Sequence, residues 1–148
     1  MTGVQTCALP IYAGITPDPH LVRHGAHLRQ AAKQMALDLL SLDDPPTAIV
    51  ASSDVQAVGV LEAAAQRGMR VPDDLSVVGY DDIDLAAPMG LTTVRQPLER
   101  SGARAADLMV SAIGAPGSSL GAASGQRTHF DELMDLELVA RSTTRPPR

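Results

Sequence analysis

The residues best suited to chemistry lie in two short polar clusters, Ser52-Ser53-Asp54 and Asp81-Asp82. Each cluster follows a short apolar run typical of a buried strand, 47–51 in the first case and 75–79 in the second. Carboxylate oxygens accept hydrogen bonds in pairs, which suits the vicinal hydroxyls of a sugar or the amines of a nucleobase. Either cluster could instead be only a helix cap, a role that Ser and Asp often fill.

A strand–helix–strand unit is expected to position these two clusters. The helix is predicted over 55–67, with a wide apolar stripe and with Gly68 as the left-handed residue that ends it. A helical crossover joins parallel strands in a right-handed sense, so the carboxyl ends of both strands meet at one edge. Ligands of open α/β sheets bind just outside that edge, and the clusters therefore predict a ligand-binding rim.

Further elements are expected on both sides of this unit, and the fold class is α/β with a parallel sheet. Apolar periodicity and the positions of Pro and Gly predict a loop over 13–19, a helix from about 27 to 42 and a short helix over 82–87. A third strand is predicted over 91–94, followed by a helix with Pro97 as its first residue that ends at Gly114. A loop over 114–125 and one or two edge strands within 130–139 complete the prediction.

Composition excludes several classes of function for this chain of 148 residues. A net charge of -5 argues against a surface that grips phosphate backbones. No apolar run approaches the roughly 20 residues of a membrane span. Tyr12, Tyr80 and Phe130 are too few aromatic residues for a base-stacking platform, and the single Cys7 excludes an internal disulfide.

Catalytic and metal-binding motifs find little support. The sequence has no Gly-x-Ser-x-Gly elbow and no glycine-rich phosphate loop. A phosphoryl-accepting aspartate would need a lysine on a neighbouring loop, and Lys33 lies inside a predicted helix. His20, His24 and His27 could share a helical face, but Gly25 interrupts it and no cysteine lies nearby, so we expect solvated histidines. We expect no enzyme, no metal and no cofactor.

A string of motifs resembles the LacI/GalR transcription regulators. It comprises Ser53-Asp54-x-x-Ala57-x-Gly59, Val71-Pro72-x-Asp74-Leu75-Ser76-Val77-Val78-Gly79-Tyr80-Asp81-Asp82, Leu91-Thr92-Thr93-Val94-x-Gln96-Pro97 and the ending Glu137-Leu138-Val139-x-Arg141-Ser142-Thr143. The resemblance runs from about Ala13 onward. Periplasmic sugar-binding proteins share the fold and the first motif but usually lack the second and third.

The resemblance implies a truncated parallel-sheet lobe of a periplasmic-binding-protein-like (type I) effector domain. Members of the family carry an N-terminal helix-turn-helix and a two-lobed effector domain, and the effector, commonly a sugar, binds between the lobes. Residues 12–148 then correspond to the C-terminal part of that domain, with the N-terminal lobe and the helix-turn-helix missing. Residues 1–11 instead resemble a translated sequencing-library adapter and are expected to be non-native.

The resemblance also implies an effector site, for which we predict Ser53, Asp54, Tyr80, Asp81 and Gln96. Asp81 falls on the aspartate with which family members contact the effector. Ser53 falls where many members have Asn, and Gln96 lies where the chain crosses toward the other lobe.

A homodimer interface is expected on the helix from Asp54, at Val55 and Val58, because that helix commonly joins subunits in the family and has surplus apolar width. The helix from Pro97 to Ile113 would pack on the missing lobe.

The leading hypothesis is a fragment of a cytoplasmic, dimeric transcription regulator that binds a carbohydrate effector, without a membrane partner. Operator DNA would be bound only through the missing N-terminal domain. The alternative is the sugar-binding protein of a transport system. An upstream helix-turn-helix would favour the first and a signal peptide the second. An enzyme on a doubly wound sheet would be favoured only if Asp81→Ala abolished a demonstrable turnover.

Overall fold

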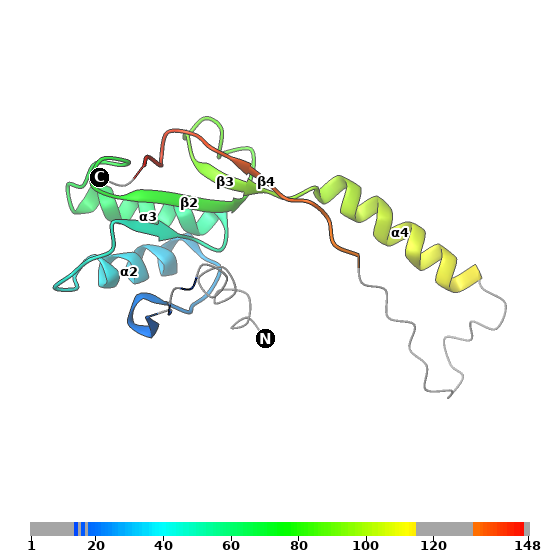
Figure 1. Ribbon diagram of the computed structural model, residues 1–148, viewed down its shortest axis with the longest axis horizontal. Helices are drawn as coiled ribbons and strands as arrows, with labels where there is room; N and C mark the ends of the chain where they lie inside the picture. The colour runs from blue at the N-terminus through cyan, green and yellow to red at the C-terminus, as the bar shows by residue number, and fades with distance from the viewer. Residues whose placement is uncertain (1–13, 15, 17, 115–131, 147–148) are drawn as a thin grey trace.

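A four-stranded sheet in the order β1-β2-β3-β4 organises the chain in the computed structural model (Figure 1). The structure describes residues 14, 16, 18–114 and 132–146. Strands β1 (Ala48–Val50), β2 (Ser76–Asp81) and β3 (Thr92–Arg95) are parallel. Strand β4 (Glu137–Val139) closes one edge of the sheet and runs antiparallel to β3. The predicted α/β fold with a parallel sheet is confirmed.

The predicted strand–helix–strand unit is formed by β1, α3 (Asp54–Gln66) and β2. The interior between α3 and the sheet is filled by small and aliphatic side chains, including Ala57, Val60, Leu75 and Val77. Gly68 has a φ of 68°, as expected for the left-handed residue that ends α3. Local patterning therefore suffices to place this central unit.

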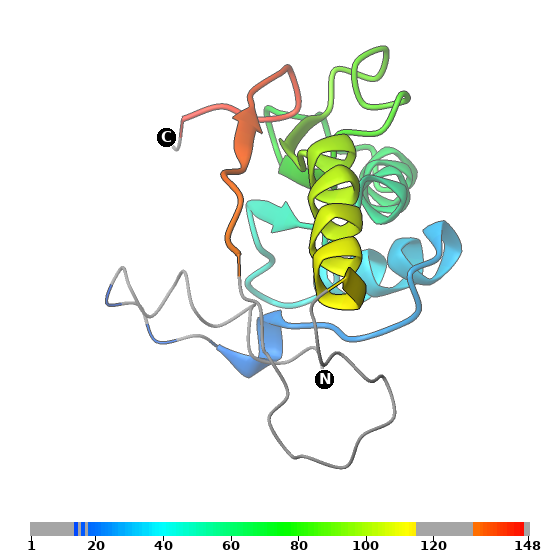
Figure 2. The same cartoon turned by 90° about the vertical axis from the view of Figure 1, so that its right-hand side faces the viewer.

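Helix α2 (Arg29–Leu39) packs against α3, and both helices lie on the same side of the sheet (Figure 2). The two backbones approach closely at Gly59, where an added Cβ would lie 2.2 Å from the carbonyl oxygen of Arg29. Much of the surplus apolar width of α3 is thus covered within the chain. Helix α2 is shorter at both ends than the predicted 27–42.

The opposite face of the sheet lacks a helical cover among the residues that the structure describes. Val50 is 76% exposed and Leu138 is 65% exposed, although parallel sheets are normally covered on both faces. Helix α4 (Leu98–Gly114) projects away from the sheet (Figure 1), and Leu98, Met109 and Val110 on it are exposed. Two apolar surfaces are therefore uncovered among the residues that the structure describes.

Several predicted elements differ in the structure. The short helix over 82–87 is wrong, because the chain there forms turns after two left-handed residues, Asp81 and Asp82. Pro97 precedes α4 instead of opening it, and its carbonyl accepts a hydrogen bond from the Ser101 amide at 2.8 Å. A 3-10 turn, η1 (Pro19–Leu21), follows the first predicted loop. Of the predicted loop over 114–125, Gly114 is the last residue of α4 and the rest lies outside the described residues.

Candidate functional site

The two polar clusters lie at the same edge of the sheet, as the sequence predicts. The register pairs Val50 with Val78, and carried three residues further along both segments it brings Ser53 level with Asp81. Asp81 is itself paired with Arg95 of β3, so Gln96 follows directly at that edge. The carboxyl ends of β1, β2 and β3 thus present their polar side chains together.

An open hollow of about 440 Å³ lies at this edge, lined by residues 81–82 and 95–100. Within it Gln96 donates a hydrogen bond from Nε2 to Oδ1 of Asp81 at 2.6 Å. In the part of the chain that the structure describes, no donor reaches Asp81 Oδ2 or Gln96 Oε1. The pair therefore presents two acceptor oxygens to a ligand that carries hydrogen-bond donors.

Asp54, another predicted effector residue, is fully buried and has partners on both carboxylate oxygens. Oδ1 accepts from the Thr93 hydroxyl at 2.6 Å, and Oδ2 accepts from the Ile83 amide at 2.9 Å. A Cβ added at Gly79 would lie only 2.1 Å from Asp54 Oδ1. The structure places Asp54 under the rim, where it ties the start of α3 to β3 and to the turn after β2.

Ser53 and Tyr80 occupy different environments at the rim. Ser53 is 8% exposed and caps α3, since its Oγ accepts from the Gln56 amide at 3.3 Å. Tyr80 is half-buried and alternates along β2 with Gly79, so it belongs to the sheet face opposite α3. Among the five predicted site residues, all of which the structure describes, only Asp81 and Gln96 are joined by a hydrogen bond between side chains.

The predicted dimer residues lie on α3. Val55 is exposed and Val58 is half-buried. Because α2 covers part of α3, the apolar surface left for a subunit contact is smaller than the sequence pattern indicates.

Asp82 has a larger structural role than the helix cap that its sequence position suggests. Its Oδ2 accepts from Arg95 Nε at 2.6 Å and its Oδ1 accepts from Arg141 Nη2 at 2.7 Å. We call Asp82, Arg95 and Arg141 the Asp82 fork. Arg95 also pairs with Glu137 at 2.9 Å, and Arg141 donates to the Leu91 carbonyl at 2.7 Å. The fork joins segments up to 59 residues apart in the sequence, which no local pattern reveals.

The backbone at Asp81 and Asp82 is left-handed, with φ angles of 114° and 57°. For residues other than glycine such conformations cost about 1–3 kcal/mol each and persist where the surroundings impose them. The surroundings here are Gln96, the two arginines of the Asp82 fork, and Asp54 at the Ile83 amide. The turn that carries the candidate ligand contact is held by side chains from α3, β3 and the segment after β4.

Acid should remove the stabilisation that the Asp82 fork provides. Burial alone would raise the pKa of Asp82, but the hydrogen bonds and charges of Arg141 and Arg95 outweigh it and lower this pKa below its usual value. A carboxyl with a lowered folded-state pKa contributes stability above its unfolded-state pKa and loses it as pH falls through the folded-state pKa. We expect Asp82→Asn to lower the free energy of unfolding at pH 7. The difference in this free energy from the wild type should shrink below about pH 4, where the wild-type carboxyl becomes protonated.

Urea unfolding of both proteins from pH 7 to pH 3 measures this difference. Asp84→Asn, at an exposed aspartate two residues further on, is the matched control and should show little effect at any pH. An Asp82→Asn effect that is independent of pH would contradict the ionic account.

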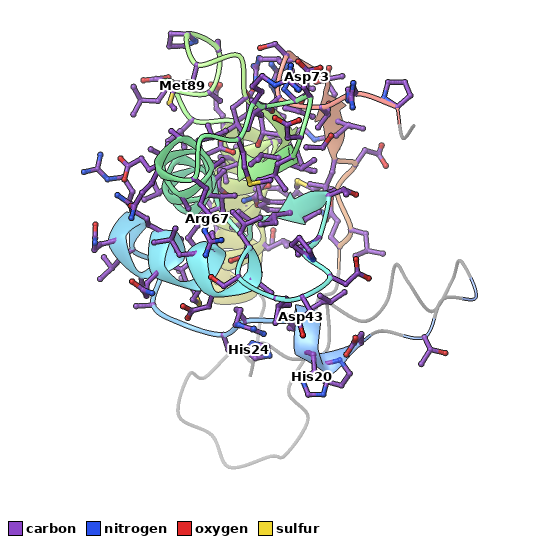
Figure 3. The ribbon with its side chains drawn as sticks, turned by 90° about the vertical axis from the view of Figure 1, so that its left-hand side faces the viewer. His20, His24, Asp43, Arg67, Asp73 and Met89 are labelled. Atoms are coloured by element: carbon purple, nitrogen blue, oxygen red, sulfur yellow. The ribbon has the colours of Figure 1, made fainter. Side chains whose placement is uncertain are left out.

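The histidines do not contribute to this rim. His20 and His24 lie on the segment that precedes α2 and are exposed (Figure 3). Over the described residues, no group of three His, Cys, Asp or Glu side chains could hold a metal ion. Nor is any helix in the described ranges long and apolar enough to cross a membrane.

Comparison with known proteins relates this architecture to transcription regulators. Residues 8–144 match the periplasmic binding protein-like domain family. The HTH-type transcriptional repressor CytR of Escherichia coli K12 is 39% identical over 134 residues, which cover 89% of this chain and 37% of CytR. The HTH-type transcriptional repressor PurR of Vibrio atlanticus is 34% identical over 90% of this chain and 38% of PurR.

Solved structures show the same relationship. A LacI-type putative regulator from Bacillus cereus subsp. cytotoxis superposes with a TM-score of 0.77 at 26% identity, covering 93% of this chain and 46% of that one. The regulator CelR, solved in complex with cellobiose, superposes with a TM-score of 0.74 at 29% identity, covering 90% of this chain and 39% of that one.

The chain thus spans well under half the length of these curated repressors, which are regulators and not enzymes. The sequence motifs, the sheet topology and the matched region all indicate the same family. The chain belongs to the periplasmic binding protein-like domain family and, within it, to the effector-binding regions of LacI/GalR-family transcription regulators.

Proposed function

We propose that residues 12–148 are the C-terminal part of the effector domain of a longer, cytoplasmic, homodimeric regulator. A small carbohydrate binds at the rim and changes the affinity for operator DNA, which a separate N-terminal domain contacts. Two observations support the larger protein: the chain matches 37% of CytR, and two apolar surfaces, on the sheet and on α4, are uncovered in the part of the chain that the structure describes. We also propose that residues 1–11 are an adapter-derived segment.

The observation that carries the proposal is the pair formed by Asp81 and Gln96. Their 2.6 Å hydrogen bond joins the two side chains and leaves one carboxylate oxygen of Asp81 and the amide oxygen of Gln96 as acceptors for a ligand with donors. Vicinal hydroxyls of a sugar supply two hydrogen-bond donors, and a charged acceptor makes the stronger bond. The CelR structure, a complex with cellobiose, supports a sugar as the class of effector.

The other predicted residues have secondary parts in this proposal. Ser53 comes level with Asp81 when the register of β1 and β2 is extended, Tyr80 precedes Asp81 in β2, and Asp54 holds the rim from below. Val55 supports a subunit contact because its apolar side chain is 43% exposed. The alternative, a sugar-binding protein of a transport system, agrees with the fold but less well with the repressors that the chain matches.

The test uses the complete reading frame that contains this chain. Operator fragments are titrated by fluorescence anisotropy in the presence of D-ribose, D-glucose, cellobiose, and a purine and a pyrimidine nucleoside. We expect at least one sugar to change operator affinity by about tenfold or more, within the usual range of allosteric coupling. Sugar binding by a protein that has no DNA affinity would favour the transport alternative, and a response to a nucleoside but to no free sugar would overturn the carbohydrate assignment.

A further inference from the structure

We propose that Asp82 is a positioning residue for the effector site. Through Arg95 and Arg141 it holds the left-handed turn at residues 81–82 in the conformation that places Asp81 beside Gln96. This inference rests on the proposed function, since it assigns to Asp82 the task of presenting the carboxylate that binds the effector.

The two aspartates of the turn, Asp81 and Asp82, have different roles because their carboxylate oxygens have different hydrogen-bond partners. Both oxygens of Asp82 accept from arginines, and its side chain is only 8% exposed, so Asp82 has little to offer a ligand. Among the described residues, Asp81 accepts a side-chain hydrogen bond only at Oδ1, from Gln96. Asp81 also lines the hollow. Asp81 is therefore the contact and Asp82 the anchor.

The pairing of residues at the end of β3 explains how the anchor acts. Arg95 bonds Asp82 and the next residue, Gln96, bonds Asp81, so two successive residues of one segment hold two successive residues of the other. The chain at both aspartates is in a conformation that non-glycine residues seldom adopt. If Asp82 releases its arginines, the turn can relax to ordinary angles, and Asp81 then turns away from Gln96.

The location of the two arginines connects the anchor to the rest of the lobe. Arg95 ends β3, from which the chain continues into α4, and Arg141 follows β4, which brings the chain back. Arg141 is further fixed by the Leu91 carbonyl at 2.7 Å, and its amide donates to Thr92 Oγ1 at 2.9 Å. Asp82 thus links the turn that carries the ligand contact to the end of β3 and to the segment after β4.

A double-mutant cycle in the complete regulator tests the inference. Calorimetry uses the sugar, among D-ribose, D-glucose and cellobiose, that moves operator binding most in the wild type. We expect Asp82→Asn to weaken its binding by about tenfold, the scale of one lost charged hydrogen bond. Asn tolerates left-handed angles, so the change removes the charge without imposing a new backbone preference. Asp84→Asn, the matched control, should bind as the wild type does.

The decisive comparison is the same substitution made in an Asp81→Ala background. If Asp82 acts through Asp81, Asp82→Asn adds no further loss there, because the contact that it positions is already gone. The inference is overturned if Asp82→Asn weakens sugar binding as much in the Asp81→Ala background as in the wild type. It is also overturned if the Asp82→Asn protein folds and binds the sugar as the wild type does. If Asp82→Asn reduces the folded fraction, Arg141→Lys replaces it, since an ammonium group keeps the charge but cannot reproduce the guanidinium geometry.

A second readout needs no effector and separates this inference from the proposed function. In ¹⁵N spectra the side-chain amide of Gln96, assigned through Gln96→Ala, should show slowed hydrogen exchange from its bond to Asp81. We expect Asp82→Asn to remove this protection and Asp84→Asn to leave it. Loss of protection without sugar binding by the wild type would sink the proposed function alone, whereas retained protection in Asp82→Asn would sink the positioning role.

Discussion

Replacing Asp54 by alanine should lower the free energy of unfolding by about 3–5 kcal/mol, because hydrogen bonds to a charged group are each worth about 1.5–3 kcal/mol. The carboxylate is fully buried, and its hydrogen bonds tie the start of α3 to Thr93 on β3 and to the Ile83 amide in the turn after β2. Their loss would leave a buried hydroxyl and a backbone amide without acceptors and a void under the rim.

Urea unfolding of the chain measures this loss. Asp84→Ala is the matched control, since Asp84 is an exposed aspartate of the same region and should change stability by less than about 0.5 kcal/mol. Gly79→Ala should mimic part of the Asp54→Ala effect, because its added Cβ would force the Asp54 carboxylate away. A loss below about 1 kcal/mol in Asp54→Ala would show that the buried carboxylate is not a structural tie.

Asp81→Ala should weaken sugar binding by the complete regulator about a hundredfold. The substitution removes the charged acceptor of the hollow and leaves Gln96 Nε2 without its partner at 2.6 Å. A hundredfold loss equals about 2.8 kcal/mol, which lies within the range of about 1.5–3 kcal/mol for one hydrogen bond from a ligand to a charged group. Operator affinity without sugar should stay within about threefold of the wild type, since the substitution lies outside the DNA-binding domain.

Calorimetry with the sugar panel and anisotropy with operator DNA supply the two measurements. Gln96→Ala should produce a smaller loss, because it removes a neutral group of the same pair. Unchanged sugar affinity in Asp81→Ala would reject the site assignment. A parallel loss of operator affinity would instead indicate damage to the fold.

The central elements and the rim are predictable from the sequence because they depend on local patterns. The apolar runs that become β1 and β2, the helical stripe of α3 and the stop at Gly68 are each encoded within a few residues. The right-handed crossover then requires parallel strands, whose ends meet at one edge. That both polar clusters lie at one edge follows from those facts, whereas the register that brings Ser53 level with Asp81 is known from the structure.

What the sequence did not reveal depends on contacts between distant segments. The short helix after β2 was expected from composition, but the Asp82 fork and Asp54 hold that stretch in a left-handed turn instead. Asp54 had the same polar character as Asp81, and only its burial against Gly79 and Thr93 separates the two roles. Likewise, the contact of α2 with Gly59 uses apolar surface that the pattern alone left for a subunit.

In the proposed site the Asp81 carboxylate, at the end of β2, accepts hydrogen bonds from the hydroxyl groups of a small ligand. A crystal structure of the complete regulator with its bound sugar tests this most directly. Hydroxyl oxygens should lie within about 2.5–3.0 Å of Asp81 Oδ2, with Gln96 still bonded to Oδ1. A sugar that is seated elsewhere, with this hollow filled only by water, would contradict it.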